Sequence, residues 1–330
     1  MMQKVRWGIL STAKIGVEKV IPAMQQGTYS EVVAIASRSA GKAQEAAGAL
    51  GIETSVSSYQ ELLDLAEVDA IYNPLPNHLH VDWSIKALQA GKHVLCEKPL
   101  GLNVADAQRL QEAAASHPKL KVMEAFMYRH HPRWRKVKEL VDNGVVGTLQ
   151  TVHSFFSYYN DDPDNIRNKP DIGGGSLMDI GCYCISVPRF IFGSEPTKVT
   201  GAMEVDPTLG IDRLTSGMLQ FAGGTATFTC GTQMAPHQKV TIMGSEGKIK
   251  IPMPFNAPVD RPTTIVLTKG SETEEISFET CNQYTAQGDR FSKAVIEDTP
   301  VPTPLDDALA NMKVVDAVVQ SSNEEAWIQY

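Results

Sequence analysis

Along the first third of the chain, short apolar runs alternate with longer segments in which apolar residues recur at helical spacing. Predominantly apolar runs of four to six residues predict buried strands at 5–10, 32–36, 70–73, 93–96 and 120–123. Apolar residues on one helical face predict helices between them, at 15–25, 41–50, 59–65, 80–90 and 103–115. This alternation predicts an α/β fold with a doubly wound parallel sheet.

From residue 149 the apolar and polar positions alternate with period two. The predicted strands are 152–158, 198–203, 215–221, 224–229, 239–243, 248–251 and 263–268. Such alternation is typical of a largely antiparallel, half-buried sheet with one open face, so the second part is an α+β domain. Helical patterns cover 132–143, 177–192, 282–298 and 304–321. We therefore expect two domains, 1–125 and 126–330, with C-terminal helices able to pack back on the first.

Composition and charge narrow the class of protein. The 330 residues are 42% hydrophobic and 21% charged, and the net charge of -8 argues against nucleic acid or an anionic membrane as partner. No stretch approaches the length of a membrane span, and the chain enters its first strand without a signal peptide. Five scattered cysteines without a CxxC pair predict free thiols, a cytoplasmic protein and no metal site.

A turn and helix start follow the first strand, at Ser11-Thr-Ala-Lys-Ile-Gly16. Backbone N–H groups and the helix dipole make such a turn a phosphate site of a dinucleotide-binding unit. Ser11, Ala13 and Gly16 stand where G-x-G-x-x-G has glycines, so the motif alone is weak evidence. The candidate contacts are Ser11, Thr12, Ala13, Lys14 and Ile15.

The second strand ends in Ser37 and Arg38, where NAD-binding proteins place a carboxylate on the ribose hydroxyls. A hydroxyl and a guanidinium can instead bind a 2′-phosphate, and Lys42 follows in the next helix. We therefore predict NADP(H) in preference to NAD(H). The alternative is that Arg38 is a solvated residue at a strand end.

The loop Asn73-Pro-Leu-Pro-Asn-His78 follows the next strand. Its two prolines predict a rigid extended loop at the carboxyl end of the sheet. Such a loop can lie along a nicotinamide ribose. The candidate contacts are Asn73, Pro74, Leu75, Asn77 and His78.

The strand at 93–96 ends abruptly in Glu97-Lys98-Pro99 and delivers an amine to the carboxyl end of the sheet. Pro99 restricts the backbone of Lys98 to extended geometry. Lys98 is therefore a candidate for chemistry and, with Glu97, for cofactor binding. The alternative is a solvated Glu-Lys pair before a turn.

Two further clusters could line a substrate pocket. Tyr128, Arg129 and His131 follow a strand, and could equally be the polar start of the helix at 132–143. Gly173 to Gly175 suggest a flexible approach to a helix that Ser176 can cap. Asp179 and Tyr183 are four positions apart, which places both on one face of that helix. Phe156, on the strand at 152–158, is another candidate substrate contact.

These residue types suit hydride transfer to or from a nicotinamide, which needs a group that exchanges the proton of the substrate oxygen. Lys98 and Tyr183 make a sensible acid/base pair, with Asp179 orienting a substrate hydroxyl or the lysine. An amine from the first domain and a phenol from the second would then act on one oxygen. The sequence has no G-x-S-x-G elbow for serine hydrolase chemistry.

The chain resembles the glucose-fructose oxidoreductase and inositol dehydrogenase (Gfo/Idh/MocA) family. The resemblance rests on Gly8–Gly16, the Asn73–His78 loop, Cys96-Glu-Lys-Pro99, Met123-Glu-Ala125 and Gly174–Tyr183. It is greatest for the branch of NADP-dependent D-xylose 1-dehydrogenases, dimeric dihydrodiol dehydrogenases and glucose-fructose oxidoreductase, because many other members carry histidine where Tyr183 stands. It covers nearly the whole chain in order.

The resemblance implies a Rossmann domain that binds NADP(H), and a homodimer or higher oligomer formed through the C-terminal sheet. It also implies that Lys98 and Tyr183 are the catalytic pair, assisted by Asp179. The leading hypothesis is an aldose 1-dehydrogenase of the D-xylose or D-glucose type, or a glucose-fructose-type oxidoreductase. The alternatives are a trans-dihydrodiol dehydrogenase, a reductase of a dicarbonyl or anhydro sugar, and a nucleotide-sensing regulator without activity.

Overall fold

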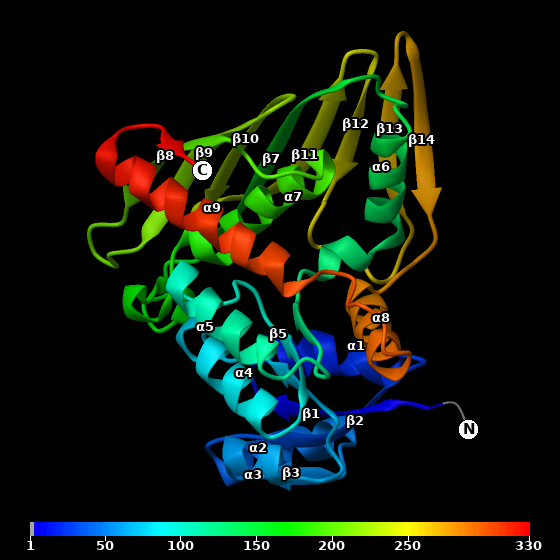
Figure 1. Ribbon diagram of the computed structural model, residues 1–330, viewed down its shortest axis with the longest axis vertical. Helices are drawn as coiled ribbons and strands as arrows, with labels where there is room; N and C mark the ends of the chain where they lie inside the picture. Colours follow the sequence, from blue (N-terminus) through cyan, green and yellow to red (C-terminus); the bar gives the residue numbers. More distant parts are fainter. Residues whose placement is uncertain (1–2) are drawn as a thin grey trace. The chain divides into compact units, whose positions relative to one another are not determined.

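The computed structural model describes residues 3–330, and the chain divides into two compact units (Figure 1). The first comprises Met1–His130, described from residue 3, together with Asn282–Leu309. The second comprises His131–Cys281 and Ala310–Tyr330. The sequence predicts no signal peptide. That expectation depends on the start of the chain, where Met1 and Met2 lie outside the described residues. Within residues 3–330, none of the helices combines the length and apolar character that crossing a membrane requires.

The first unit is built on a parallel sheet of six described strands, in the order β3-β2-β1-β4-β5-β6. The strands are β1 (Val5–Leu10), β2 (Ser30–Ala36), β3 (Thr54–Val56), β4 (Ala70–Asn73), β5 (His93–Cys96) and β6 (Val122–Glu124). Chain order reverses between β1 and β4, and dinucleotides bind at the carboxyl ends of the strands beside such a point. The predicted doubly wound α/β fold is confirmed.

Helices cover this sheet, and most of them turn an apolar face toward it. They are η1 (Gly16–Val20), α1 (Ile21–Gln25), α2 (Ala40–Leu50), α3 (Tyr59–Asp64), η2 (Asn77–Leu79), α4 (His80–Gln89), α5 (Val104–Ala115), η3 (Met127–His130) and α8 (Gln283–Ile296). Trp7 of β1 is fully buried, and its Nε1 donates to Ser292 Oγ of α8 at 3.1 Å. Phe291 packs on the same indole at 5.3 Å between ring centroids. The late helix α8 therefore completes the core of the first unit.

The second unit is built on a sheet of nine described strands, in the order β14-β13-β12-β11-β7-β10-β9-β8-β15. They are β7 (Leu149–Tyr159), β8 (Lys198–Val205), β9 (Asp212–Phe221), β10 (Gly224–Gly231), β11 (Gln233–Gly244), β12 (Gly247–Pro252), β13 (Thr263–Lys269), β14 (Glu272–Phe278) and β15 (Ile328–Gln329). Only β7 and β10 pair in parallel among these strands, which confirms the largely antiparallel sheet. The strands β14 and β15 were not predicted, since β14 is rich in glutamate and β15 has two residues.

The helices of the second unit position the remaining candidate residues. They are α6 (Pro132–Asp142), η4 (Ile166–Asn168), η5 (Pro170–Ile172), η6 (Leu177–Gly181), α7 (Cys182–Phe192) and the part of α9 (Leu305–Glu324) that follows Leu309. The helices α6 and α7 lie against the nine-stranded sheet (Figure 1). The predicted helix at 177–192 is present, but its first five residues form the π-helical turn η6.

Candidate active site

The turn after β1 has the backbone shape that the glycine motif usually provides. Ser11 has a φ of 72°, in the left-handed region that favours glycine, and its Oγ accepts from Ala13 N at 3.2 Å. A Cβ on Gly16 would lie 3.7 Å from both Tyr72 and Pro74, so the helix packs closely on the sheet here. The first helical N–H groups have no intrahelical acceptor. The turn therefore fits the pyrophosphate of a dinucleotide, with Ser11, Thr12, Ala13, Lys14 and Ile15 around it.

The end of β2 carries a cation without a local counterion. Arg38 and Lys42 are exposed, and Arg38 forms no ion pair within residues 3–330. Burial raises the pKa of Tyr59, and the charge of Arg38 opposes that shift, so the guanidinium lies beside the Tyr59 hydroxyl. Ser37 is buried, and its Oγ accepts from Ser39 N at 3.3 Å. The group best able to contact a ligand phosphate here is therefore Arg38.

The loop after β4 is held from inside by Asn73. This buried amide donates to His80 O at 3.0 Å and to Ser84 Oγ at 3.1 Å, and it accepts from Leu75 N at 3.3 Å. The predicted extended loop is correct up to Pro76 and wrong for Asn77 and His78, which lie in the 3-10 turn η2. The sequence beyond Pro76 has no proline to remove N–H donors, so Leu79 N can donate to Pro76 O at 2.8 Å.

The backbone around Lys98 is fixed on both sides. Glu97 N donates to Asn73 O at 3.0 Å, and the Glu97 carboxylate accepts from the Tyr72 hydroxyl at 2.7 Å. The Lys98–Pro99 peptide bond is cis. Lys98 itself is half-buried at the carboxyl end of β5, where the sequence predicts it.

His80 joins the two loops of this region. Its Nδ1 contacts Pro99 O at 2.8 Å and its Nε2 contacts Leu75 O at 2.6 Å. Burial lowers the pKa of His80 to about 4, and the positive charge of Lys98 acts in the same direction. The Lys98 ammonium is therefore close enough to His80 to affect its titration.

In the second unit, Tyr183 is buried among aromatic rings near the start of α7. Its ring centroid lies 5.9 Å from that of Phe156 on β7 and 5.3 Å from that of Phe255, and these two phenylalanines stack at 4.9 Å. Phe156, a predicted substrate contact, therefore also supports the phenol. Phe255 was not predicted, because it lies in an irregular segment between β12 and β13 where no periodicity marks it.

Asp179 of η6 is held by two residues that the sequence analysis did not select. The Tyr158 hydroxyl donates to its Oδ2 at 2.5 Å, and Arg167 Nε lies 3.1 Å from its Oδ1. Tyr158 could have been found, because it is two residues from Phe156 and lies on the same face of β7. Arg167 lies in the short 3-10 helix η4, and no local pattern connects it with Asp179.

The start of this helix is organised by Asp212, and the predicted cap at Ser176 is wrong. Ser176 has helical φ and ψ, and its Oγ donates to Asp212 Oδ2 at 2.6 Å. The same oxygen accepts from Leu177 N at 2.8 Å, so Asp212 of β9 replaces a local cap. The glycines serve close packing, since a Cβ on Gly175 (φ 108°) would lie 1.9 Å from Asp212 Oδ1.

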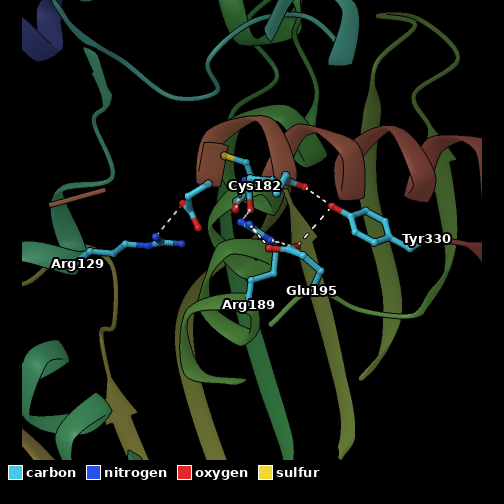
Figure 2. Close-up of polar contacts among 8 residues, drawn as sticks. Arg129, Cys182, Arg189, Glu195 and Tyr330 are labelled. Atoms are coloured by element: carbon cyan, nitrogen blue, oxygen red, sulfur yellow. Dashed lines mark hydrogen bonds and ion pairs between the residues drawn. The ribbon is translucent and has the colours of Figure 1, made fainter. Parts of the chain in front are cut away.

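A network of polar contacts connects α9 and the C-terminus with α7 (Figure 2). One of these contacts is made at Cys182, the residue before Tyr183. Asn311 Nδ2 donates to Cys182 O at 3.2 Å, and its Oδ1 accepts from Arg189 Nη1 at 3.1 Å. Arg189 also pairs with Glu195 at 2.6 Å, and Tyr330 OH donates to Ala310 O at 2.9 Å. The backbone that precedes the candidate phenol is therefore bonded from outside its own helix.

Tyr128, Arg129 and His131 follow β6 and have different structural roles. His131 is the N-cap of α6, where its Nδ1 accepts from Arg133 N at 3.2 Å. Arg129 is buried and pairs with Asp307 at 2.8 Å (Figure 2), and its Nε donates to Tyr128 OH at 3.3 Å. His131 thus follows the helix-start interpretation. Tyr128 and Arg129 as substrate contacts stay a prediction.

Comparison with known proteins finds a family model for each of the two parts of the chain. Residues 5–126 match the model of an oxidoreductase family with an NAD-binding Rossmann fold, and residues 134–250 match that of the GFO/IDH/MocA C-terminal domain. The chain is 43% identical to the uncharacterized oxidoreductase ORF334 of Rhizobium meliloti, over 99% of each chain. It is 35% identical to D-xylose 1-dehydrogenase (NADP(+)) 2 of Haloferax volcanii, over 98% of this chain and 99% of the other.

Solved structures show the same similarity. The 3-ketoreductase KijD10 of Actinomadura kijaniata, in complex with NADP and TDP-benzene, superposes with a TM-score of 0.90 at 31% identity. That comparison covers 97% of this chain and 98% of the other. With both domain models matched in order and relatives similar over their full length, the chain belongs to the Gfo/Idh/MocA family and is an NAD(P)-dependent oxidoreductase.

Proposed function

We propose that the protein is an NADP(H)-dependent dehydrogenase that oxidises the anomeric carbon of an aldose such as D-xylose or D-glucose. The observation that carries the proposal is the Lys98 loop at the carboxyl end of β5, which the hydrogen bonds of Glu97 hold in place, two strands from the β1 turn that fits a dinucleotide. The similarity to an NADP-dependent D-xylose 1-dehydrogenase supports the choice of substrate class.

NADP(H), when bound, accepts or supplies the hydride. The residues that would hold it are Ser11, Thr12, Ala13, Lys14, Ile15, Ser37, Arg38, Lys42, Asn73, Pro74, Leu75, Asn77, His78, Glu97 and Lys98. Arg38 supplies the preference for the 2′-phosphate, because its charge has no ion-pair partner within residues 3–330. The similarity to KijD10, whose structure contains NADP, is consistent with this preference.

The remaining steps belong to the side chains of the chain itself. Lys98 and Tyr183 exchange the proton of the sugar hydroxyl that becomes the carbonyl oxygen. Asp179 accepts a hydrogen bond from a neighbouring hydroxyl and orients the ring. Phe156, Tyr128 and Arg129 are the further proposed substrate contacts.

We also propose a cytoplasmic homodimer that forms through the open face of the nine-stranded sheet. Val240 and Ile242 of β11 are buried, whereas the alternating Met243 is exposed, as is Met218 on β9. Exposed apolar side chains on the uncovered face favour association with a second copy. Light scattering of the purified protein tests the dimer, and a monomer at all concentrations would contradict it.

A second candidate is reduction of a keto sugar, favoured by the similarity to the 3-ketoreductase KijD10. The broader alternatives are oxidation of a trans-dihydrodiol, reduction of a dicarbonyl or anhydro sugar, and a nucleotide-sensing role without turnover. The enzymatic candidates all transfer a hydride and differ only in the substrate. A panel of substrates therefore distinguishes them.

The decisive experiment measures absorbance of the reduced nicotinamide with D-xylose, D-glucose, a trans-diol and a dicarbonyl, each with both nucleotides. We expect turnover of an aldose with NADP+, and loss of turnover in Lys98→Ala with nucleotide binding retained. Near-normal activity of Lys98→Ala would exclude its catalytic role. Nucleotide binding without turnover of any substrate would favour the sensing role.

A further inference from the structure

The loop between β7 and η6 lies directly against the start of the helix that carries Asp179. Gly175 N donates to Arg167 O at 2.8 Å, and Gly174 N donates to Lys169 O at 3.0 Å. A Cβ on Gly174 would lie 2.6 Å from Arg167 O and 2.7 Å from Lys169 O. Because a side chain has no room there, the glycines allow the backbone around Arg167 to reach the helix.

The same contacts continue to Asp179. Its backbone N donates to Gly175 O at 3.1 Å, so the residue that bonds Arg167 also bonds Asp179. The side chains then meet, with Arg167 Nε 3.1 Å from Oδ1 and the Tyr158 hydroxyl 2.5 Å from Oδ2. These two donors engage different carboxylate oxygens, which fixes the rotation of the group as well as its position.

Both donors keep their protons. The charge of Asp179 is the main cause that raises the pKa of Arg167. Burial raises the pKa of Tyr158, and Asp179 shifts it further in the same direction. Two such donors stabilise the ionised form of a carboxylate. A carboxylate oxygen has more than one lone pair, so each can still accept from a hydroxyl of a ligand.

We propose that Arg167 and Tyr158 are positioning residues that hold the Asp179 carboxylate in one orientation, as the acceptor for a hydroxyl beside the reacting carbon of a sugar. This inference rests on the proposed function. It assigns to the loop at 160–175 a part in the reaction, and it makes a neutral polyol, which offers such a hydroxyl, the matching substrate class.

The side chain of Arg167 is 41% exposed and that of Asp179 is 12% exposed, so this partly solvated ion pair should contribute less to stability than a fully buried one, and its loss should leave the fold intact. This permits Arg167→Met and Tyr158→Phe as probes. The chain also offers matched controls in the same unit. Arg213, 44% exposed, pairs with Glu204 at 3.4 Å, and Tyr159 OH donates to Asp161 at 3.1 Å.

The test compares kcat for D-xylose oxidation with NADP+ in the single variants Arg167→Met, Tyr158→Phe and Asp179→Asn and in the double variant of Arg167 and Asp179. Misplacement of a reacting group by about 1 Å costs roughly 100-fold, so we expect a 10- to 100-fold loss in Arg167→Met and Tyr158→Phe. The KM for NADP+ should stay unchanged. Arg213→Met and Tyr159→Phe should match the unmodified protein. Arg167→Met should cost no further activity once Asp179→Asn is present.

A substrate-independent measurement is carboxyl ¹³C NMR of aspartate-labelled protein, with Asp179→Asn used to assign the signal. In Arg167→Met, the Asp179 carboxyl should titrate at a higher pH than in the unmodified protein. An unchanged titration, or additive losses of kcat in the double variant, would overturn the positioning role. If the unmodified protein does not oxidise D-xylose, the choice of substrate fails, while the NMR titration still decides whether Arg167 controls Asp179.

Discussion

Asp212 offers a sharp test of how the candidate site is supported, because one of its oxygens accepts three hydrogen bonds. Its Oδ2 accepts from Ser176 Oγ at 2.6 Å, Leu177 N at 2.8 Å and Thr215 Oγ1 at 2.7 Å. All three donors are buried, and Asp212 itself is 7% exposed. Replacing it with alanine would leave them without this acceptor.

The loss of unfolding free energy in Asp212→Ala can be estimated from these contacts. A buried donor left unpaired costs about 1–3 kcal/mol, so three give an upper range of about 3–9 kcal/mol. Two effects reduce this sum. Ser176 Oγ has a second acceptor, Cys230 O, at 3.5 Å. Burial raises the pKa of Asp212, so removing the carboxylate also relieves a desolvation cost. We expect Asp212→Ala to lower the free energy of unfolding by about 3–5 kcal/mol.

Asp212→Asn gives the matched comparison. Since all three donors converge on Oδ2, an amide oxygen placed there can accept from each, while the charge is lost and the other oxygen is replaced by an NH2 donor. We expect a loss of about 1–2 kcal/mol, by denaturant unfolding followed by circular dichroism. Asp260→Ala, at an exposed position, should leave the unfolding midpoint unchanged. A loss below about 1 kcal/mol in Asp212→Ala, or equal losses for alanine and asparagine, would refute the reasoning.

Three further predictions address other parts of the chain. Arg38→Ala should weaken NADP(H) binding by about 1.5–3 kcal/mol and NAD(H) binding far less, as measured by fluorescence titration; equal weakening would contradict the 2′-phosphate contact. Burial lowers the pKa of His80 and His131 to about 4 and that of His130 to about 3, so the unfolded state binds more protons between pH 6.5 and 4. The free energy of unfolding should therefore fall on acidification through that window, by up to about 1.4 kcal/mol per pH unit for each histidine, and a flat profile would contradict it. Gly175→Ala should lower the melting temperature much more than Gly270→Ala, because both have positive φ but only Gly175 has a side chain in the way; equal shifts would count against the close packing.

The elements of the first unit could be predicted because their signals are local. The strand at 93–96 is a mainly apolar run that ends at the charged pair Glu97 and Lys98, and β5 has those bounds. The end of a strand in a parallel sheet also fixes where the next side chains emerge, which is why the position of Lys98 follows from the sequence.

The support of the second group of site residues could not be predicted, because it depends on pairs distant in the sequence. A serine before a helix is a common cap, and nothing local shows that Asp212, 35 residues from Leu177, takes that place. The same holds for Arg167 and Asp179, which come together through the backbone hydrogen bonds of Gly175, and Gly175 lies eight residues after Arg167. Glycines read as flexible linkers were in fact the positions at which two segments approach most closely.

The glycine run connects stability with chemistry in the second unit, and the two can be separated. Gly174 admits the backbone of the Arg167 loop, and Gly175 admits the side chain of Asp212. Asp212 then satisfies the first helical N–H, while Arg167 acts on the carboxylate two residues further along. A change at Gly175 disturbs both contacts, so it should lower stability and activity together. Arg167→Met disturbs only the contact with the Asp179 carboxylate. We expect this variant to lower kcat while the unfolding midpoint stays the same.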